Sequence, residues 1–497
     1  MADITARARP VAWRGGHALL ALAAGAVMAL GTPPYDLWPL AILAIIAIFA
    51  ILRRARRWAL VGWAAGTGYF GLGLSWIVEP FFIEPEIYGW MAPFALVGLA
   101  AGLALFWALA FGIAARLPGH RFLALAVLWT AAEFARGTIL TGFPWSLVGY
   151  LWLETPVIQW VSVAGPHGLT FATLALAALA AAGRRPAIAA ACGVALLWTG
   201  GLMLTPPPQD LSDRPVVRLV QPNAPQTEKW DPARQRVFYE RGLDFTAAPP
   251  EDPARAPALV VWPETALPML LEDAGNAFAA MTDAADGAPV ASGILRYEDG
   301  RYYNALALIE DGAATQIYDK HHLVPFGEYM PLPGLVSRLG LQALAARATG
   351  GFAAGPGPRP MPLGDLGTAL PLICYEAVFP QDIHAADFRP DWMLHVTNDA
   401  WFGTWSGPYQ HLAQSRIRAI ERGVPLLRAA NTGVSAAIDG AGRVLASLDL
   451  GQAGYVDAPL PPPLRVTPYS RIGDWPLLVL LVSVLAFAVL RSPRDSV

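Results

Sequence analysis

Three residues in the second half of the chain carry the side chains that an acyl-transfer reaction needs. Cys374 ends an apolar, strand-like run, Glu264 follows another such run after a rigid Trp-Pro pair, and Lys320 precedes two histidines. A thiolate can attack a carbonyl carbon, a carboxylate can take and return the proton, and an ammonium can stabilise the oxyanion. We therefore expect these residues to form one site, with Cys374 as nucleophile, Glu264 as base and Lys320 as oxyanion stabiliser.

Each of these residues also has a simpler interpretation. A lone cysteine is usually a small buried hydrophobe, a glutamate after a strand is often a first-turn helix acid, and most lysines are solvated. The catalytic interpretation is favoured because all three lie at strand ends or beside them. There we expect an exposed, rigidly held sulfur on Cys374 and a partly desolvated carboxylate on Glu264 with a raised pKa. Glu328 is available to hold the Lys320 ammonium.

Cysteine and histidine spacing argues against a disulfide framework or a metal site. Cys192, the only other cysteine, lies in an unrelated apolar run. His321, His322 and His411 stand near polar motifs, but no His-x-x-x-His sequence or cysteine pair accompanies them. We expect neither a metal nor another cofactor.

Composition indicates a membrane protein. The chain has 497 residues, of which 55% are apolar and only 15% charged, which is too apolar for a purely soluble protein. A net charge of −3 and the lack of a basic domain exclude nucleic acid as a bulk partner.

Eight apolar runs are candidate membrane spans. The first two are short for a hydrocarbon core, which takes about 20 residues. The first run could instead be a cleaved signal peptide, but further apolar runs follow at once and favour a retained span. Seven runs precede residue 205 and one follows residue 474: 16–30, 37–52, 58–77, 91–115, 122–139, 157–182, 187–204 and 475–490.

Positive charge lies in every second loop, which predicts the orientation. Under the positive-inside rule these loops are cytoplasmic, so both termini face the cytoplasm and residues 205–474 lie outside it. The basic residues are Arg7, Arg9 and Arg14; Arg53, Arg54, Arg56 and Arg57; Arg116 and Arg121; Arg184 and Arg185; and Arg491 and Arg494.

The loop 141–155 is rich in aromatic residues and falls on the outer side. Trp145, Tyr150 and Trp152 are either interfacial anchors or a lining for a lipid chain. In the run before it, Glu133 and Arg136 are one helical turn apart, a spacing that allows them to pair within the membrane.

Beyond Thr205 and its three following prolines, short apolar strands alternate with helical stretches and predict an α/β layered domain covered on both faces. A helix is expected over 410–422, with Arg416, Arg418 and Arg422 on a solvated face. We see no internal repeat. The domains are therefore expected at 1–205, 206–470 and 471–497. The strands are expected at 216–220, 258–262, 289–295, 305–310, 368–374, 392–397, 425–429 and 435–439.

Four sequence blocks carry a resemblance to a known family. Trp262-Pro263-Glu264, Lys320 in Lys-His-His-Leu-Val-Pro-Phe-Gly-Glu, Cys374-Tyr375-Glu376 and the block that begins at Asn398 resemble the Glu–Lys–Cys site of the nitrilase superfamily. With spans before and after this domain, the whole chain resembles the apolipoprotein N-acyltransferase family. The stretch from Val220 to Trp230 is similar to the same family.

The resemblance implies a nitrilase-like αββα sandwich on about eight spans. It implies Glu328 and Glu376 as supporting acids, and it places Tyr375 and Trp230 in the site or in loops around it. Asn398 either shapes the mouth of the site or is only a turn.

The resemblance also implies a two-step reaction in the Gram-negative inner membrane, with a periplasmic catalytic domain and a monomeric enzyme. Cys374 takes an acyl chain from a phospholipid, typically phosphatidylethanolamine. The thioester then acylates the α-amino group of an apolipoprotein whose N-terminal cysteine carries diacylglycerol. Because an α-amino group has a pKa of about 7.7–8.0, a carboxylate base has to assist its deprotonation only modestly.

Two other functions are compatible with parts of the sequence. A membrane-tethered amidase or nitrilase would use the same three residues on a small amide, with water as acceptor. A transporter with an extracytoplasmic binding domain would need broken helices in paired halves, which the sequence does not show convincingly.

Overall fold

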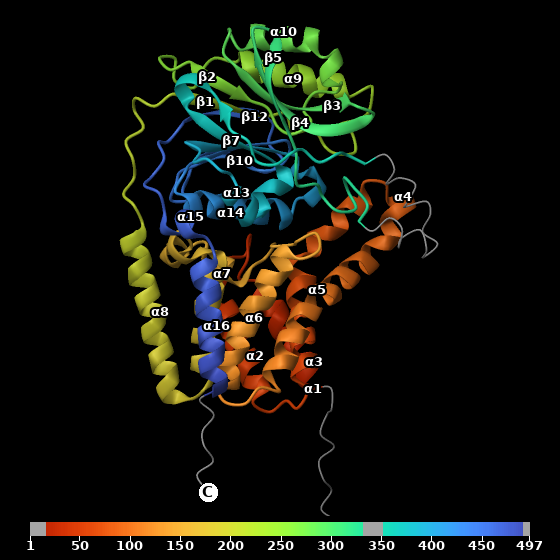
Figure 1. Cartoon of the computed structure of the whole chain (residues 1–497). Helices are drawn as coiled ribbons and strands as arrows, with labels where there is room; N and C mark the ends of the chain where they lie inside the picture. Colours follow the sequence, from red (N-terminus) through yellow and green to blue (C-terminus); the bar gives the residue numbers. More distant parts are fainter. Residues whose placement is uncertain (1–15, 332–350, 491–497) are drawn as a thin grey trace, which may run out of the picture.

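The computed structural model describes residues 16–331 and 351–490, and it stacks an α/β part on a bundle of helices (Figure 1). Eight longer helices of the bundle correspond to the eight predicted apolar runs. They are α1 Gly16–Ala29, α2 Trp38–Leu52, α3 Trp58–Gly73, α5 Ala92–Ala114, α6 Arg121–Thr138, α7 Val161–Ala181, α8 Arg184–Leu204 and α16 Trp475–Leu490.

Among the residues that the structure describes, three helical segments are long and apolar enough to cross a membrane by length and composition: Pro85–Ala114, Pro156–Ala181 and Arg184–Leu204. The helices α1, α2 and α16 are apolar but shorter. These helices fit a membrane protein, and the count of eight spans stays a prediction.

The predicted ion pair in α6 is confirmed. Arg136 Nη2 lies 2.7 Å from Glu133 Oε2, and both side chains are fully buried. Trp107 Nε1 from α5 also donates to Glu133 Oε1 at 2.7 Å. The ion pair and the hydrogen bond from Trp107 offset the cost of burying these two charges within the bundle.

The aromatic residues of the loop before α7 are not interfacial anchors, and their role as a lining for a lipid chain stays a prediction. Trp145, Tyr150 and Trp152 are all buried, because the α/β part lies on top of the loop. Trp152 Nε1 donates to Thr173 Oγ1 at 2.8 Å, as expected for an indole N–H removed from water.

The α/β part is a sandwich of two six-stranded sheets, in the orders β12-β1-β2-β3-β4-β5 and β11-β10-β9-β8-β7-β6. The first sheet contains β1 Val216–Gln221, β2 Pro257–Val261, β3 Val290–Glu298, β4 Arg301–Glu310, β5 Ala313–Asp319 and β12 Gly454–Pro459. The second contains β6 Met361–Pro362, β7 Thr368–Ile373, β8 Trp392–Thr397, β9 Leu426–Ala430, β10 Ser435–Ile438 and β11 Val444–Leu448.

Helices cover both outer faces of the sandwich, as the sequence predicted. On the first sheet, α9 Gln235–Ala247 and α10 Gly275–Ala284 pack with buried side chains of β2 and β3. On the second, α13 Pro380–His384 and α14 Gly407–Arg422 face the helical bundle (Figure 1). All eight predicted strands are confirmed. Six of them are the parallel strands, which read as continuous apolar runs because both of their faces are buried, and the other two are the neighbouring antiparallel strands β4 and β10.

The two sheets repeat one arrangement that the sequence does not reveal. Each has three parallel strands, β1-β2-β3 or β7-β8-β9, with antiparallel strands on either side. The strands that sequence reasoning missed are the four at the sheet edges, β5, β6, β11 and β12. Exposed and partly exposed residues alternate along β5, so it lacks the apolar run of a central strand.

The expectation of a solvated arginine face on α14 is wrong. Arg418 is completely buried, and its Nη2 lies 2.7 Å from Glu421 Oε1 and 2.9 Å from the Tyr150 hydroxyl. Arg422 is also buried, and Arg416 pairs with Glu154. The helix is enclosed because it lies between the second sheet and the helical bundle (Figure 1).

Candidate active site

Glu264 and Lys320 meet in one buried cluster. Each residue follows the end of a strand, β2 or β5, in the first sheet. Lys320 Nζ lies 3.3 Å from Glu264 Oε1 and 2.8 Å from Glu328 Oε1. Burial disfavours the ammonium, but Glu328 and Glu264 outweigh it and raise the pKa of Lys320 well above its ordinary value. Lys320 is therefore a fixed cation, and Glu328 contacts it as predicted.

The Glu264 carboxylate is held by donors on both of its oxygens. Asn304 Nδ2 donates to Oε1 at 2.7 Å, and the backbone N–H of Asn398 donates to Oε2 at 2.8 Å. Burial alone would favour the neutral acid, but Lys320 and Asn304 outweigh it and lower the pKa of Glu264. The expected rise in its pKa is thus wrong, and Glu264 is ionised at neutral pH.

Asn398 lies in the site, at the end of β8, and is more than a turn residue. Its side chain donates to Gln226 Oε1 at 2.8 Å and accepts from Asn431 Nδ2 at 2.9 Å. These bonds fix the backbone N–H that points at Glu264, so Asn398 positions the carboxylate.

Cys374 stands directly after β7 in a strained turn. Its φ is 51°, in the left-handed region, which costs a non-glycine residue about 1–3 kcal/mol. The residue is only 5% exposed, so the expectation of an exposed sulfur is wrong. Burial and then the Glu264 charge raise the pKa of the Cys374 thiol, against the opposing effect of Lys320. The resting sulfur is therefore a neutral thiol.

Two buried histidines hold this turn from behind. His395 on β8 and His411 on α14 each place Nε2 3.1 Å from the carbonyl oxygen of Cys374, where a ring N–H donates. Burial, and then the Arg428 cation, lower the pKa of both rings, which keeps them neutral. Sequence reasoning considered His411 only as a metal ligand, and nothing in the sequence brings it near Cys374.

Glu376 lies under the site. It is fully buried, and its carboxylate accepts from the Tyr318 hydroxyl at 3.0 Å and from the backbone N–H groups of His321 and Ile373 at 2.7 Å each. It therefore ties the strand that precedes Cys374 to the segment that follows Lys320, and its supporting role in the reaction stays a prediction.

The Tyr375 side chain packs beside Cys374. Its ring lies edge-on to Phe379, with centroids 4.8 Å apart, and to His322, with centroids 5.7 Å apart. Its side chain is buried next to Cys374, and its part in the site stays a prediction.

Lys229 is a second lysine at the site that sequence reasoning did not single out. Its Nζ donates to Thr265 Oγ1 at 2.7 Å and to the Glu264 carbonyl oxygen at 3.1 Å. Burial lowers the pKa of Lys229 to about 8, although Glu264 and Cys374 oppose this. The only signal in the sequence was its place before Trp230 in the family-like stretch.

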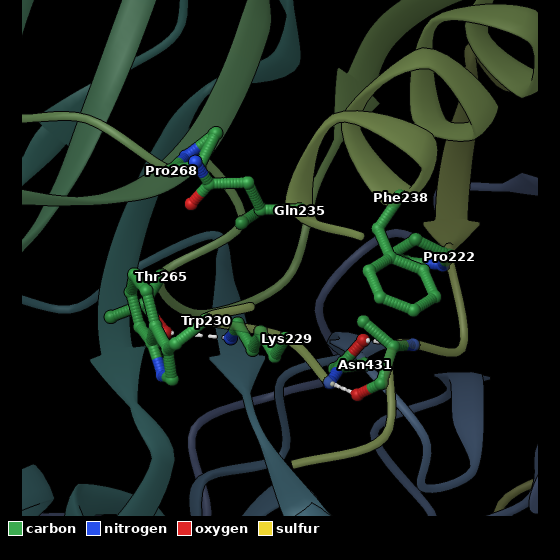
Figure 2. A pocket seen from close by; sticks show the side chains of 10 residues that line it. Pro222, Lys229, Trp230, Gln235, Phe238, Thr265, Pro268 and Asn431 are labelled. Carbon is green, nitrogen blue, oxygen red and sulfur yellow. Dashed lines mark hydrogen bonds between the residues drawn. The ribbon is translucent and has the colours of Figure 1, made fainter. Parts of the chain in front are cut away.

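Lys229 and Trp230 line a small hollow beside Thr265 (Figure 2). Its volume of about 10 Å³ has room for about one water molecule, so it is no substrate pocket. Trp230 is 44% exposed, and its ring lies 5.6 Å from Lys229 Nζ. Thr265 has a φ of 46°, and the bond from Lys229 holds this strained residue next to Glu264.

Within residues 16–331 and 351–490, no group of three or more His, Cys, Asp or Glu side chains could hold a metal ion. His321 and His322 instead contact carboxylates. His321 Nδ1 lies 2.6 Å from Glu376 Oε1, and His322 Nδ1 lies 2.6 Å from Asp382 Oδ2.

The two-sheet sandwich with a glutamate, a lysine and a cysteine at its strand ends defines a carbon–nitrogen hydrolase domain. The carbon–nitrogen hydrolase family matches residues 217–466, and the apolipoprotein N-acyltransferase N-terminal domain matches residues 24–179. The chain belongs to the apolipoprotein N-acyltransferase family.

Curated relatives extend this similarity along nearly the whole chain. An apolipoprotein N-acyltransferase of Rhodopseudomonas palustris is 39% identical, over 97% of this chain and 96% of that protein. Those of Bradyrhizobium diazoefficiens and Caulobacter vibrioides are each 38% identical, over 96% of this chain and 96% and 94% of those proteins.

Proposed function

We propose that this protein moves a fatty acyl chain from a phospholipid, through a thioester on Cys374, to the α-amino group of apolipoproteins. The acceptor is an N-terminal cysteine that already carries diacylglycerol. One observation carries the proposal: a buried Glu264–Lys320 pair and a thiol at a strand end occur in a chain that also has a bundle of apolar helices. This chain is similar to apolipoprotein N-acyltransferases over almost its full length.

In the first step the thiol attacks the carbonyl carbon of the phospholipid ester. Because the Cys374 thiol is neutral and Glu264 is ionised, Glu264 takes the proton as the carbon–sulfur bond forms. Lys320 stabilises the oxyanion. The ester carbon–oxygen bond then breaks, Glu264 returns the proton to the departing oxygen, and lysophospholipid leaves.

In the second step the deprotonated α-amino nitrogen attacks the thioester carbonyl. Glu264 takes a proton from the nitrogen as the amide forms, and the carbon–sulfur bond breaks. The departing sulfur regains the proton and the thiol is restored. A thioester suits this exchange because it is more reactive towards amines than the oxygen ester from which the acyl chain came.

We also propose about eight membrane spans, with both termini in the cytoplasm and the catalytic domain in the periplasm. The domain limits are 1–205, 206–470 and 471–497. The alternation of basic loops and the apolar helices support this arrangement. A phosphatidylethanolamine-like donor and a monomeric enzyme complete the proposal. Both substrates are lipid-anchored, so a catalytic domain at the membrane surface gains effective concentration.

The test is transfer to a defined acceptor. Purified protein is incubated with phosphatidylethanolamine vesicles and a peptide whose N-terminal cysteine carries diacylglycerol. The mass of the peptide is then measured by mass spectrometry. We expect a gain of one acyl group on the α-amine, with none on an N-acetylated control peptide and none with Cys374→Ser. Release of free fatty acid without peptide acylation would instead identify a hydrolase.

A further inference from the structure

A cavity lies between α1 and α2, far from the catalytic residues along the chain. Its volume is about 380 Å³, within the range of about 300–1,000 Å³ typical of small-molecule sites. The walls are apolar, and the short alanine side chains where the helices face each other leave the space open. The wall residues are Leu20, Ala24, Ala47, Ala50 and Ile51.

The remaining lining residues are basic. They are His17, in the first turn of α1, and Arg54, two residues after α2. The Arg54 side chain is exposed, and its guanidinium makes no hydrogen bond or ion pair with any residue that the structure describes. The neighbouring Arg53, in contrast, is engaged, since its Nη1 donates to the Ala181 carbonyl oxygen at 3.0 Å. None of the lining residues that the structure describes is acidic, so the cavity combines an apolar slot with a cation that no described carboxylate neutralises.

The cavity is at the end of the bundle away from the α/β part. α1 begins there, and the α/β part stacks on the opposite end (Figure 1). Cys374 and its partners belong to the α/β part, so a ligand in this cavity is separate from the acyl donor. The loop beside it also carries Arg56 and Arg57, which makes this end of the bundle strongly basic.

We propose that this cavity binds an anionic phospholipid of the adjoining leaflet. An acyl chain lies between α1 and α2, and the phosphate contacts Arg54 with His17 beside it. Basic pockets between membrane helices on the cytoplasmic side select anionic headgroups, because a zwitterionic headgroup would bring its own ammonium to the arginine. The lipid fills a gap between two helices that are short for a membrane span. The inference depends on the bundle lying in a bilayer but not on the acyl-transfer reaction.

The test is lipid retention by the full-length protein. The protein is reconstituted in equal amounts of phosphatidylethanolamine and phosphatidylglycerol and extracted with mild detergent. The lipid that stays bound is then identified and quantified by native mass spectrometry. We expect retained phosphatidylglycerol to fall about fivefold in Arg54→Gln, because the direct contact between the lipid phosphate and the guanidinium is lost. Arg56→Gln, in the same loop but outside the cavity, is the matched control and should retain the lipid.

A second variant separates the cavity from surface charge. Ala47→Phe fills the slot and leaves both cations, and we expect it also to lose the retained lipid. Equal phosphatidylglycerol retention by wild type and Arg54→Gln would overturn the proposal. So would equal losses in Arg54→Gln and Arg56→Gln, because only the general charge of the loop would then matter. Loss only on removal of residues 2–15 would assign the lipid to that segment instead.

Discussion

The protonation states of Cys374, Glu264 and Lys320 indicate at which point of the proposed reaction the thiol loses its proton. The thiol is buried and neutral, Glu264 is ionised, and Lys320 is a fixed cation between two carboxylates. A resting thiolate would be both costly to bury and open to oxidation. The proposed transfer of the proton to Glu264, only as the sulfur attacks, would avoid both problems.

Lys229 should give the first step a pH dependence. Because burial lowers its pKa to about 8, it is mostly charged at pH 7 and loses its proton as the pH rises through about 8. Its charge favours the developing thiolate, so we expect the rate of Cys374 acylation to fall above pH 8. At pH 7, Lys229→Met should be about tenfold slower, a change of about 1.4 kcal/mol in the barrier.

Acylation is followed by rapid quenching and intact mass, without the amine acceptor, so that titration of the amine does not enter. The acylation rate of the Lys229→Met variant should not fall near pH 8. Thr265→Ser keeps the hydroxyl that Lys229 contacts, so its acylation rate should still fall near pH 8. A fall of the same size near pH 8 in Lys229→Met would contradict this role.

Strand ends account for the part of the site that was predictable. Glu264, Cys374 and Asn398 each follow a buried parallel strand, and such strands are recognisable as apolar runs. The strand before Lys320 was missed because its exposure alternates at the sheet edge. The direction of the Glu264 pKa shift could not be predicted from the sequence. It depends on Lys320 and Asn304, which contact the Glu264 carboxylate from other strands.

Gly293 on β3 is predicted to be essential for the position of Glu264. A Cβ there would lie 2.5 Å from both Glu264 Cα and Thr265 N. We expect Gly293→Ala to displace the carboxylate and slow acylation of Cys374 about 100-fold, as a shift of about 1 Å in a reacting group can do.

Gly275→Ala is the matched control, because a Cβ there meets no atom of the described residues within 4 Å. Its acylation rate should equal that of wild type. A Gly293→Ala variant that folds and acylates normally would show that the strand does not fix Glu264.

His321, in the segment after β5, should make the stability of the fold depend on pH. Burial opposes the charge on His321, but Asp382 and Glu376 outweigh it and raise the pKa of His321 to about 9. A folded-state pKa above the ordinary 6.5 stabilises the fold fully below about pH 6.5, and this contribution is lost as the pH rises through about 9.

Thermal unfolding of the purified protein at several pH values measures this effect. The midpoint for wild type should fall between pH 6.5 and 9 by more than it does for His321→Gln, which cannot carry the charge. Parallel curves for the two proteins would rule out the contribution of His321.

One glutamine links the two halves of the molecule. Gln410 on α14 accepts from Trp76 Nε1 at 3.2 Å and Trp145 Nε1 at 2.8 Å, and it donates to the carbonyl oxygens of Pro33 at 3.3 Å and Gly73 at 2.9 Å. All four partners belong to the helical bundle. The sequence predicted α14 and the bundle separately but not this contact, because nothing in either pattern shows which faces meet.

Gln410→Leu should therefore weaken the joint between the halves. It leaves buried N–H and C=O groups without partners, and each such group costs about 1–3 kcal/mol. We expect a clearly lower midpoint of thermal unfolding and faster proteolysis between the two parts. Gln414→Leu is the control one turn away, since neither of its amide atoms has a partner within the described parts of the chain. Equal destabilisation by both substitutions would contradict this role for Gln410.

The most direct test of the proposed reaction is the intact mass of the protein after incubation with phosphatidylethanolamine and no amine acceptor. We predict a gain of one fatty acyl group that hydroxylamine removes. It should be absent from Cys374→Ser and slowed at least about 100-fold by Glu264→Gln, the usual range for losing a general base. Wild-type protein that is folded, lipid-bound and free of any such adduct would contradict the thioester mechanism.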